Sequence, residues 1–197
     1  MTLEVRRAGR KDLLTAIDIL EEASSWVASL GMDGWEPGSF RAPESIGHRA
    51  LRDDFAAGDL YLARRDGRPV ATITLRSSDP LYWPGAPEDA LYVHRLAVRR
   101  DAVGSGVGHS LLRWSEEKAI ARGRSFLRLD CPSTNPVLLG FYRSAGFEHG
   151  GDLVVGGLQL SLLQKPCGPS FGGNVEPNSG LAQDVGLGFD STTRGKG

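Results

Sequence analysis

The sequence contains little cysteine, no long apolar segment and no excess of charge of either sign. Its two cysteines, Cys131 and Cys167, stand far apart among 197 residues, which excludes a framework of several disulfides. A single bond between them is the alternative to our expectation of two reduced thiols in the cytoplasm. No stretch approaches the roughly 20 apolar residues of a membrane-spanning helix. The opening residues, MTLEVRRAGRKD, lack the apolar segment of a secretory signal.

The balance of charges argues against polyanionic partners. The chain has 24 acidic and 23 basic residues, a net charge of −1, so it has no general attraction to nucleic acid or anionic membranes outside a local patch. The hydrophobic content of 40% and charged content of 24% are ordinary for a globular protein. The length fits one domain with a substantial core. We therefore expect small-molecule partners and no membrane association.

The spacing of apolar residues predicts elements in the order β-α-α-β-β-β-α-β-α-β-β. Strands are expected at 2–8, on both sides of Asp66–Gly67, at 90–98, at 125–131 and as a pair within 150–164. Helices are expected from Asp12 to Gly31, near 43–57, from Gly108 to Gly123, and from Asn135 to Gly146. This order predicts an α/β protein in which a mixed sheet carries helices on both faces.

The last 32 residues differ in composition from the rest. From Pro166 onward the chain holds eight glycines and three prolines without a sustained period. We therefore expect one domain at 1–165 and a tail or arm at 166–197.

The helix after the predicted strand at 90–98 begins in an unusual way. The stretch HRLAVRRDAVGSGVGHSLLRW, residues 94–114, places Gly104, Gly106 and Gly108 between strand and helix. The first turn of a helix offers unpaired N–H groups and a partial positive charge, which suit a phosphate. The segment lacks the Lys-Ser/Thr of a Walker A loop and the Gly-x-Gly-x-x-Gly of a dinucleotide fold. A phosphate-bearing ligand is predicted, and a tight connection without a ligand is the alternative.

Two separate motifs resemble those of the GCN5-related N-acetyltransferases (GNAT superfamily). The first is Leu96-Ala97-Val98 followed by Val103-Gly104-Ser105-Gly106-Val107-Gly108, and the second is Asn135, Phe141-Tyr142 and Gly146-Phe147. The likeness covers roughly residues 2–164. It implies the GNAT fold, a central and mostly antiparallel sheet with one splayed parallel strand pair.

The same resemblance implies acetyl-CoA as the co-substrate and no metal ion. The backbone at Leu96, Ala97 and Val98 would pair with the pantetheine arm, and the amides of residues 103–108 would hold the pyrophosphate, with Asn135 also at the coenzyme. Val103 stands where the family usually has Arg or Gln, although valine keeps the backbone N–H that often makes the contact.

Acetyl transfer to an amine needs a proton acceptor for the amine and a proton donor near the thiolate. Tyr142 is the candidate acid, since a phenol with a pKa of about 10 stays protonated at neutral pH. It matches the tyrosine that related enzymes place beside the thioester, and packing beside Phe141 is the alternative. His94 is the candidate base, because a similar histidine serves arylalkylamine N-acetyltransferases. Strand alternation puts His94 on the side of Leu96 and Val98, so a core-facing histidine is the alternative.

The amine acceptor is expected between two loops rich in Pro and Gly and the early helices. Trp35, Tyr82 and Trp83 are candidates for the wall of its pocket, or else they only hold those loops to the body. Asp79, Glu36 and Glu88 are candidate ammonium partners, and Asp130 would orient the base or bind the amine. Cys131 shares the apolar face of its strand with Leu127 and Leu129, so we expect an inert thiol and not an acyl-carrying nucleophile.

These observations predict an acetyl-CoA-dependent N-acetyltransferase that acts on a small amine or an amino acid derivative by direct transfer. One alternative is an acyltransferase of the same fold that uses an aminoacyl-tRNA donor, which would need a basic stripe on the surface. The other is a non-catalytic coenzyme A-binding domain, in which His94 and Tyr142 are dispensable. Homodimers are common for this fold, and the sequence leaves that question open.

Overall fold

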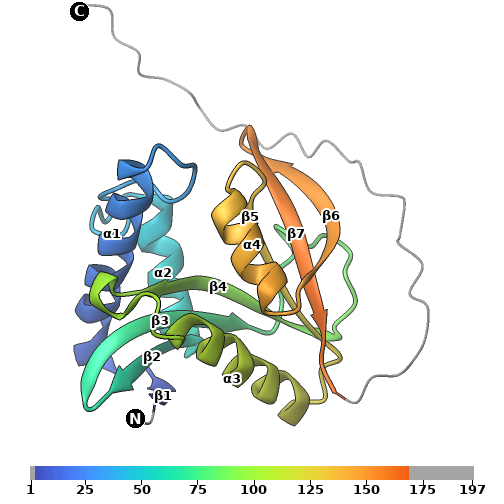
Figure 1. The fold of residues 1–197 in the computed structure, drawn as a ribbon, viewed down its shortest axis with the longest axis horizontal. Coiled ribbons are helices and arrows are strands. Elements are labelled where there is room, and N and C mark those ends of the chain that lie inside the picture. Colours follow the sequence, from blue (N-terminus) through green and yellow to red (C-terminus); the bar gives the residue numbers. More distant parts are fainter. Residues whose placement is uncertain (1–2, 169–197) are drawn as a thin grey trace, which may run out of the picture.

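The strand segments assemble into one seven-stranded sheet in the order β1-β2-β3-β4-β5-β7-β6 (Figure 1). The computed structural model describes residues 3–168. The strands are β1 (Leu3–Arg7), β2 (Leu60–Arg65), β3 (Arg68–Arg76), β4 (Ala90–Val98), β5 (Phe126–Pro132), β6 (Glu148–Val155) and β7 (Leu158–Pro166). The helices are α1 (Leu13–Ser29), α2 (Ile46–Ala57), α3 (Val107–Ala121) and α4 (Pro136–Ser144), with short 3-10 turns at Arg10–Asp12 and Arg100–Ala102.

The element order and the mixed α/β class are as the sequence predicts. The second helix begins at Ile46, later than expected, because Ser45 caps it by accepting a hydrogen bond from His48 N at 3.1 Å. Asn135 caps α4, as predicted, by accepting from Leu138 N at 3.0 Å. Among the described helices, none is both long and apolar enough to cross a membrane. Of the predicted tail, Pro166 is the last residue of β7, and positions 169–197 lie outside the described residues.

One parallel pair interrupts an otherwise antiparallel sheet. β4 and β5 pair only from Ala90 with Phe126 to Tyr92 with Arg128. Beyond these pairs, β5 continues its ladder with β7 up to Pro132, and β4 continues with β3 up to Val98. The two strands therefore diverge, which confirms the predicted splayed pair.

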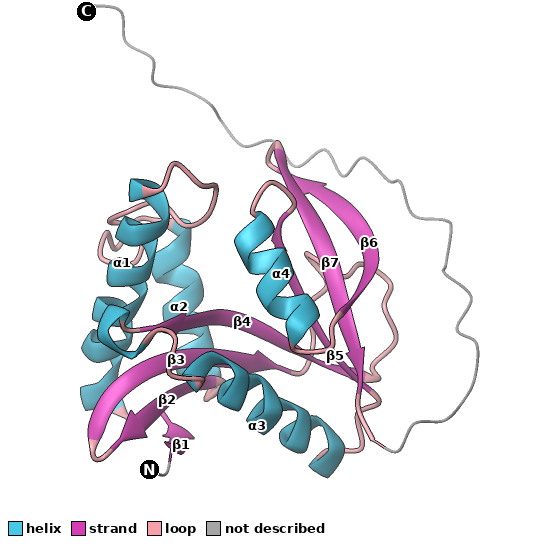
Figure 2. Cartoon of the chain, viewed as in Figure 1, coloured by secondary structure: helices cyan, strands magenta, loops and turns pink. Residues whose placement is uncertain are grey.

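Helices cover both faces of the sheet (Figure 2), and each face has its own apolar cluster beneath them. On one face, α1 and α2 pack on Leu60, Leu62 and Ala97. On the other face, α3 and α4 pack on a larger cluster that includes Ile73 and Leu129. The buried residues of α3 are the predicted ones, Val107, Leu111, Leu112, Ser115 and Ala119. Each face of the sheet therefore has its own helix pair.

A bulge in β4 corrects the predicted orientation of His94. Thr74 of β3 pairs with His94, but Thr72 pairs with Ala97, so two residues of β4 stand opposite one residue of β3. The extra residue is Arg95, whose φ is +48°. Cross-strand partners share a face, so His94 lies on the α1/α2 face with Ala97 and not, as alternation predicts, on the side of Leu96 and Val98.

The buried carboxylate of Asp12 joins the start of α1 to the sheet. It accepts hydrogen bonds from Gly9 N at 2.8 Å and from Arg64 Nη2 at 2.9 Å, and it pairs with Arg6 at 3.1 Å. Burial acts to raise the pKa of Asp12, but the bond from Gly9 and the two guanidinium groups outweigh burial and lower it.

The substitution Asp12→Asn tests this anchor through its pH dependence. Because the folded pKa lies below the usual value of 3.8 for aspartate, the ionised carboxylate stabilises the fold above that value and loses its contribution as pH falls through the folded pKa. We expect the variant to lose about 1–2 kcal/mol of unfolding free energy at neutral pH. Urea denaturation of both proteins should show this difference shrink in acid, and a difference that stays constant would contradict the assignment.

Candidate active site

The turn before α3 presents backbone donors to open space. Gly104 and Gly106 both have φ of +79°, and a Cβ added at either would meet nothing within 4 Å. The first intrahelical bond runs from Ser110 N to Gly106 O at 3.0 Å, and no side chain caps the helix. The amides of Val107 and Gly108 precede that bond, so they have no acceptor in the helix. The turn thus combines unpaired N–H groups with free access, which is what an anion site requires.

The third glycine, Gly108, allows two helices to pack closely. A Cβ at Gly108 would lie 2.9 Å from Cζ of Phe141, so α3 and α4 touch where this side chain is missing. Ser105 accepts from Arg65 Nη1 at 3.0 Å through its hydroxyl, which brings a guanidinium to the turn. Val103 has extended backbone and is half exposed. The three glycines look alike in the sequence, but in the structure Gly104 and Gly106 are open positions and Gly108 is a packing contact.

His94 and Asp130 face each other where β4 and β5 part. Each lies two residues beyond the last parallel pair, Tyr92 with Arg128, and therefore on the same α1/α2 face. His94 Nδ1 is 4.0 Å from Asp130 Oδ1. That oxygen is enclosed and finds no hydrogen-bond partner among the described residues. Burial raises the pKa of Asp130; His94 opposes this rise and Asp79 adds to it.

The other nitrogen of His94 is engaged by Asp79, from the loop between β3 and β4. Nε2 lies 2.7 Å from Asp79 Oδ2, and the Asp79 carboxylate is buried. A carboxylate only accepts, so the hydrogen of a neutral His94 resides on Nε2 and the lone pair of Nδ1 faces Asp130. The Tyr82 ring lies beside the imidazole at 5.7 Å between centroids. This arrangement leaves Nδ1 of His94 facing the opening between the strands.

The same three residues have the spacing of a metal site. Ligand atoms of Asp79, His94 and Asp130 lie within 4.8 Å of one another. However, the two carboxylates face different nitrogens of one ring. Three protein ligands is the smallest set for zinc, so the cluster offers that minimum and no more. The absence of a metal ion therefore stays a prediction.

Tyr142 and Cys131 lie on the opposite face of the sheet from His94. Both belong to the cluster under α3 and α4, and the Tyr142 ring packs against Phe141 at 5.2 Å and Phe147 at 5.9 Å. Burial, with smaller contributions from Cys131 and Asp130, raises the pKa of Tyr142 above its usual value. Tyr142 therefore stays protonated. The structure does not bring Tyr142 and His94 onto one face, because the opening between β4 and β5 lies between them.

The predicted acceptor residues occupy separate places. Trp35 packs edge-on to Phe40 at 5.4 Å in the loop after α1. Trp83 lies 6.2 Å from the Tyr92 ring and 5.2 Å from the Arg128 guanidinium. A cavity between the β3–β4 loop and β4 is lined by Asp79, Trp83, Glu88 and Tyr92, among others. Of the predicted aromatic wall, Tyr82 is the ring beside His94.

Sequence reasoning missed the residue that holds the loop between α1 and α2. Glu21 of α1 is buried, and its carboxylate accepts from the amides of Gly38, Phe40 and Arg41 at 2.6, 2.7 and 3.0 Å. A charged residue four positions after buried Ile17 was the available signal. Opposite, Thr134 donates to Asp33 at 2.6 Å, which joins the loop to the turn before α4.

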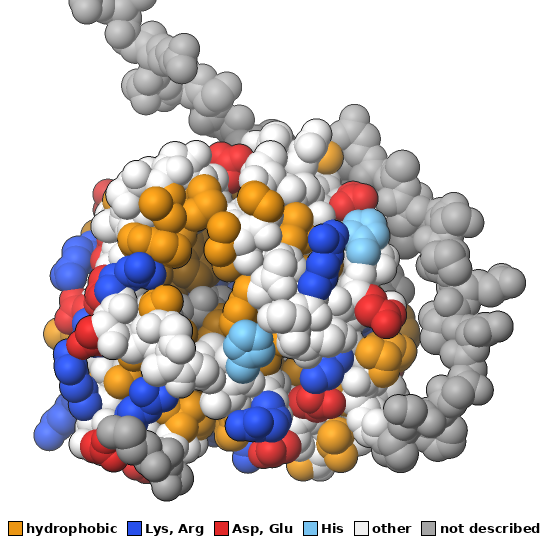
Figure 3. All heavy atoms as spheres, in the orientation of Figure 1, with side chains coloured by type: hydrophobic (Ala, Val, Ile, Leu, Met, Phe, Trp, Pro, Cys, Tyr) orange, Lys and Arg blue, Asp and Glu red, His pale blue; other side chains and the backbone are white. Residues whose placement is uncertain are grey.

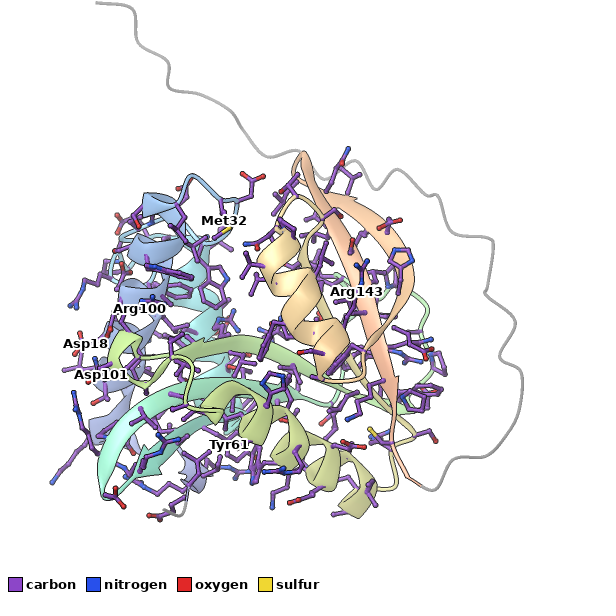
Figure 4. The ribbon with its side chains drawn as sticks, in the orientation of Figure 1. Asp18, Met32, Tyr61, Arg100, Asp101 and Arg143 are labelled. Atoms are coloured by element: carbon purple, nitrogen blue, oxygen red, sulfur yellow. The ribbon has the colours of Figure 1, made fainter. Side chains whose placement is uncertain are left out.

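The space between this loop and α4 is a hollow rimmed by hydrophobic side chains (Figure 3). Met32 lies at its edge in Figure 4.

A second feature that sequence reasoning missed is a buried ion cluster beside His94, in which Arg76 and Arg95 share Asp54 of α2. No sequence pattern joins these three residues, because they come from three distant elements.

Comparison with known proteins identifies relatives of the chain. Residues 29–147 match the model of the acetyltransferase (GNAT) family. The uncharacterised N-acetyltransferase YesJ of Bacillus subtilis is 25% identical over 72% of this chain and 79% of its own. The S-(2-succino)cysteine N-acetyltransferase of the same organism is 30% identical over 64% of this chain and 84% of its own.

Solved structures show the same fold. A GNAT-family acetyltransferase from Listeria monocytogenes has a TM-score of 0.66 at 25% identity, covering 83% of this chain and 94% of its own. The PaiA N-acetyltransferase of Thermoplasma acidophilum, solved in complex with coenzyme A, has a TM-score of 0.66 at 20% identity, covering 84% of this chain and 99% of its own.

We expect both cysteines to react slowly with thiol reagents. Neither forms a disulfide, and burial raises the pKa of each thiol to about 11, with Asp130 adding at Cys131 and Glu116 at Cys167. About one molecule in a thousand is then a thiolate at pH 8. Ellman's reagent should react fully only after guanidinium unfolding, with glutathione as the reference thiol. Rapid reaction of the native protein would contradict the assignment.

Proposed function

Since the chain belongs to the acetyltransferase (GNAT) family and is an N-acetyltransferase, we propose that it moves the acetyl group of acetyl-CoA directly to the amine of a small molecule or an amino acid derivative. The observation that carries this proposal is that His94 Nδ1 lies 4.0 Å from a carboxylate oxygen of Asp130 that accepts no hydrogen bond from the described residues, at the opening between β4 and β5. An enclosed carboxylate oxygen without a hydrogen bond is costly unless a ligand supplies a cation or a donor. An ammonium group supplies both.

The coenzyme fits the structure at two places. The amides of Val107 and Gly108 and the open positions at Gly104 and Gly106 suit a diphosphate. Past Tyr92, the β5-facing edge of β4 has no ladder partner among the described residues, so the backbone of Leu96 to Val98 is free to pair with an extended chain that carries amides. A pantetheine arm is such a chain, and the PaiA relative binds coenzyme A.

The proposed proton path begins at the acceptor. An aliphatic amine with a pKa of about 10.4 arrives protonated, and Asp130 binds that ammonium. His94 Nδ1 takes one proton while Asp79 holds the Nε2 hydrogen and stabilises the imidazolium. The neutral nitrogen then forms its bond to the acetyl carbon as the carbon–sulfur bond breaks, and the second proton of that nitrogen passes to solvent as the amide forms.

On the other face, Tyr142 assists the leaving thiolate. Because burial raises its pKa, the hydroxyl keeps its proton in the presence of a thiolate whose own pKa is about 8.5. Tyr142 therefore stabilises the negative sulfur by a hydrogen bond, and the thiolate is protonated from solvent after release. This role is narrower than that of the full proton donor expected from the sequence.

The direct test mixes purified protein with acetyl-CoA and a panel of amines and follows free thiol and acetylated product. Thiol release that depends on a particular amine supports the proposal. An aminoacyl-tRNA donor would need a basic stripe on the surface, and the face in Figure 3 shows basic and acidic side chains mixed and no such stripe. Binding of coenzyme A without turnover of any amine would favour the non-catalytic domain. Acyl transfer from an aminoacyl-tRNA, with no binding of acetyl-CoA, would favour the second donor.

The variant Tyr142→Phe tests the role of the hydroxyl. We expect kcat to fall about tenfold or more, since one donor to a developing anion is lost, while the KM for acetyl-CoA stays within about twofold. Tyr61→Phe is the matched control, because Tyr61 is buried beneath α3 against Trp114 and away from the opening (Figure 4). Unchanged kcat in the Tyr142 variant would remove this residue from the mechanism.

A cycle of two substitutions tests the orientation of His94. An amide in Asp79→Asn can donate to Nε2 and favours the wrong tautomer, so we expect kcat to fall about tenfold or more. Because Asp79 acts only through His94, the double variant with His94→Gln should be no slower than His94→Gln alone. Asp101→Asn, which removes an exposed partner of Arg68, is the control. Additive losses would mean that Asp79 acts independently of His94.

A further inference from the structure

Two arginines and one aspartate form a buried charged cluster beside His94. Asp54 of α2 is 3% exposed. Its Oδ1 accepts from Arg76 Nε at 2.6 Å, and its Oδ2 accepts from Arg95 Nη1. Two guanidinium groups therefore share one carboxylate. Asp59 lies nearby: burial and the charge of Asp54 raise the pKa of Asp59, and Arg122, Arg7 and Arg76 oppose that rise.

The two guanidinium groups retain unused donors. Each offers five N–H groups, and Asp54 engages one nitrogen of each. Among the described residues, no nitrogen of Arg76 or Arg95 is both enclosed and without a hydrogen-bond partner, in contrast to one nitrogen each of Arg64 and Arg128. Their side chains are 23% and 11% exposed, so their spare donors face open space.

These donors lie next to the amine site. The bulge in β4 turns His94 and Arg95, consecutive residues, toward the same α2-facing side. Tyr82 connects the two groups: burial raises the pKa of its hydroxyl, the charges of Asp130 and Asp79 raise it further, and Arg95 and Arg76 lower it. A single hydroxyl thus feels the acidic pair and the basic pair at once. The acidic pair, Asp130 and Asp79, and the basic pair, Arg95 and Arg76, therefore lie around one ring.

We propose that the acceptor is an amino acid or a close derivative with a free carboxylate next to its amine, an inference that rests on the proposed function. The amine occupies the space between His94 Nδ1 and Asp130 Oδ1. The carboxylate accepts from the spare N–H groups of Arg95 and Arg76, whose planar forks match its two oxygens. A zwitterion satisfies both pairs, whereas a simple amine leaves the arginine donors unpaired.

The first test compares each of a panel of L-amino acids with its C-terminal amide as acceptor, at a fixed concentration of acetyl-CoA. An amide lowers the basicity of the neighbouring amine, so more of it is neutral and the amide is intrinsically the better nucleophile at neutral pH. Preference for the free acid therefore reports recognition of the carboxylate. We expect kcat/KM to be at least about tenfold higher for the acid. Equal or better use of the amides would overturn the proposal.

The second test uses Arg76→Gln, which leaves the Arg95–Asp54 pair in place. We expect the KM for the amino acid to rise about tenfold, with the KM for its amide and for acetyl-CoA within about twofold. Arg52→Gln removes the same charge from an exposed position on α2 and is the matched control. If Arg76→Gln does not fold, Arg76→Lys keeps the charge without the fork and should give a smaller rise in the same KM. A rise that is equal for acid and amide would overturn the carboxylate contact.

A calorimetric titration separates this proposal from the one on which it rests. The complex of the protein with coenzyme A is titrated with an amino acid and then with its amide. Preferential binding of the acid in this titration, together with no acetylated product in the acetyl-CoA assay, would contradict the proposed transfer and retain the carboxylate site. Turnover of acids and amides at equal rates would retain the transfer and overturn the carboxylate site.

Discussion

The early end of the ladder between β4 and β5 is the constraint on which the rest of the structure depends. Three residue pairs join the two strands before β5 continues with β7 and β4 continues with β3. Hydrogen bonds to β3 and β7 therefore hold the two strands apart beyond these pairs. His94 and Asp130 lie at its start and the glycine turn lies beyond its end. The geometry of the proposed transfer follows from where this ladder stops.

A second constraint acts within β4 itself. The bulge at Arg95 holds a residue other than glycine at φ of +48°, a conformation that costs about 1–3 kcal/mol. The buried pair between Arg95 and Asp54 offsets this cost and joins the bulge to α2. The bulge matters because it selects the face on which His94 lies. One irregular residue thus decides whether a histidine belongs to the core or to the site.

Local patterns in the sequence were enough to predict most of the fold but only part of the site. The buried stripe of α3 and the alternation of Leu127 and Leu129 depend on periodicity within one element, so they were predicted. The orientation of His94 depends on register against β3, which no local pattern records. The partners of Glu21 and Arg95 come from distant elements, and such pairings exist only after folding. The sequence pattern was enough to name Asp130 as a candidate. That its Oδ1 has no hydrogen-bond partner among the described residues depends on the folded surroundings, which the pattern does not contain.

The contact of Gly108 with Phe141 sets a length. Under the proposed function, the distance from the diphosphate to the thioester sulfur is fixed by the covalent chain of the coenzyme. On the protein, the matching distance runs from the start of α3 to Tyr142, the residue after Phe141, and the close contact between the two helices at Gly108 fixes it. The pair therefore works as a molecular ruler. Thioesters on a longer or shorter arm would present their sulfur out of step with the tyrosine, even when their phosphates bind equally well.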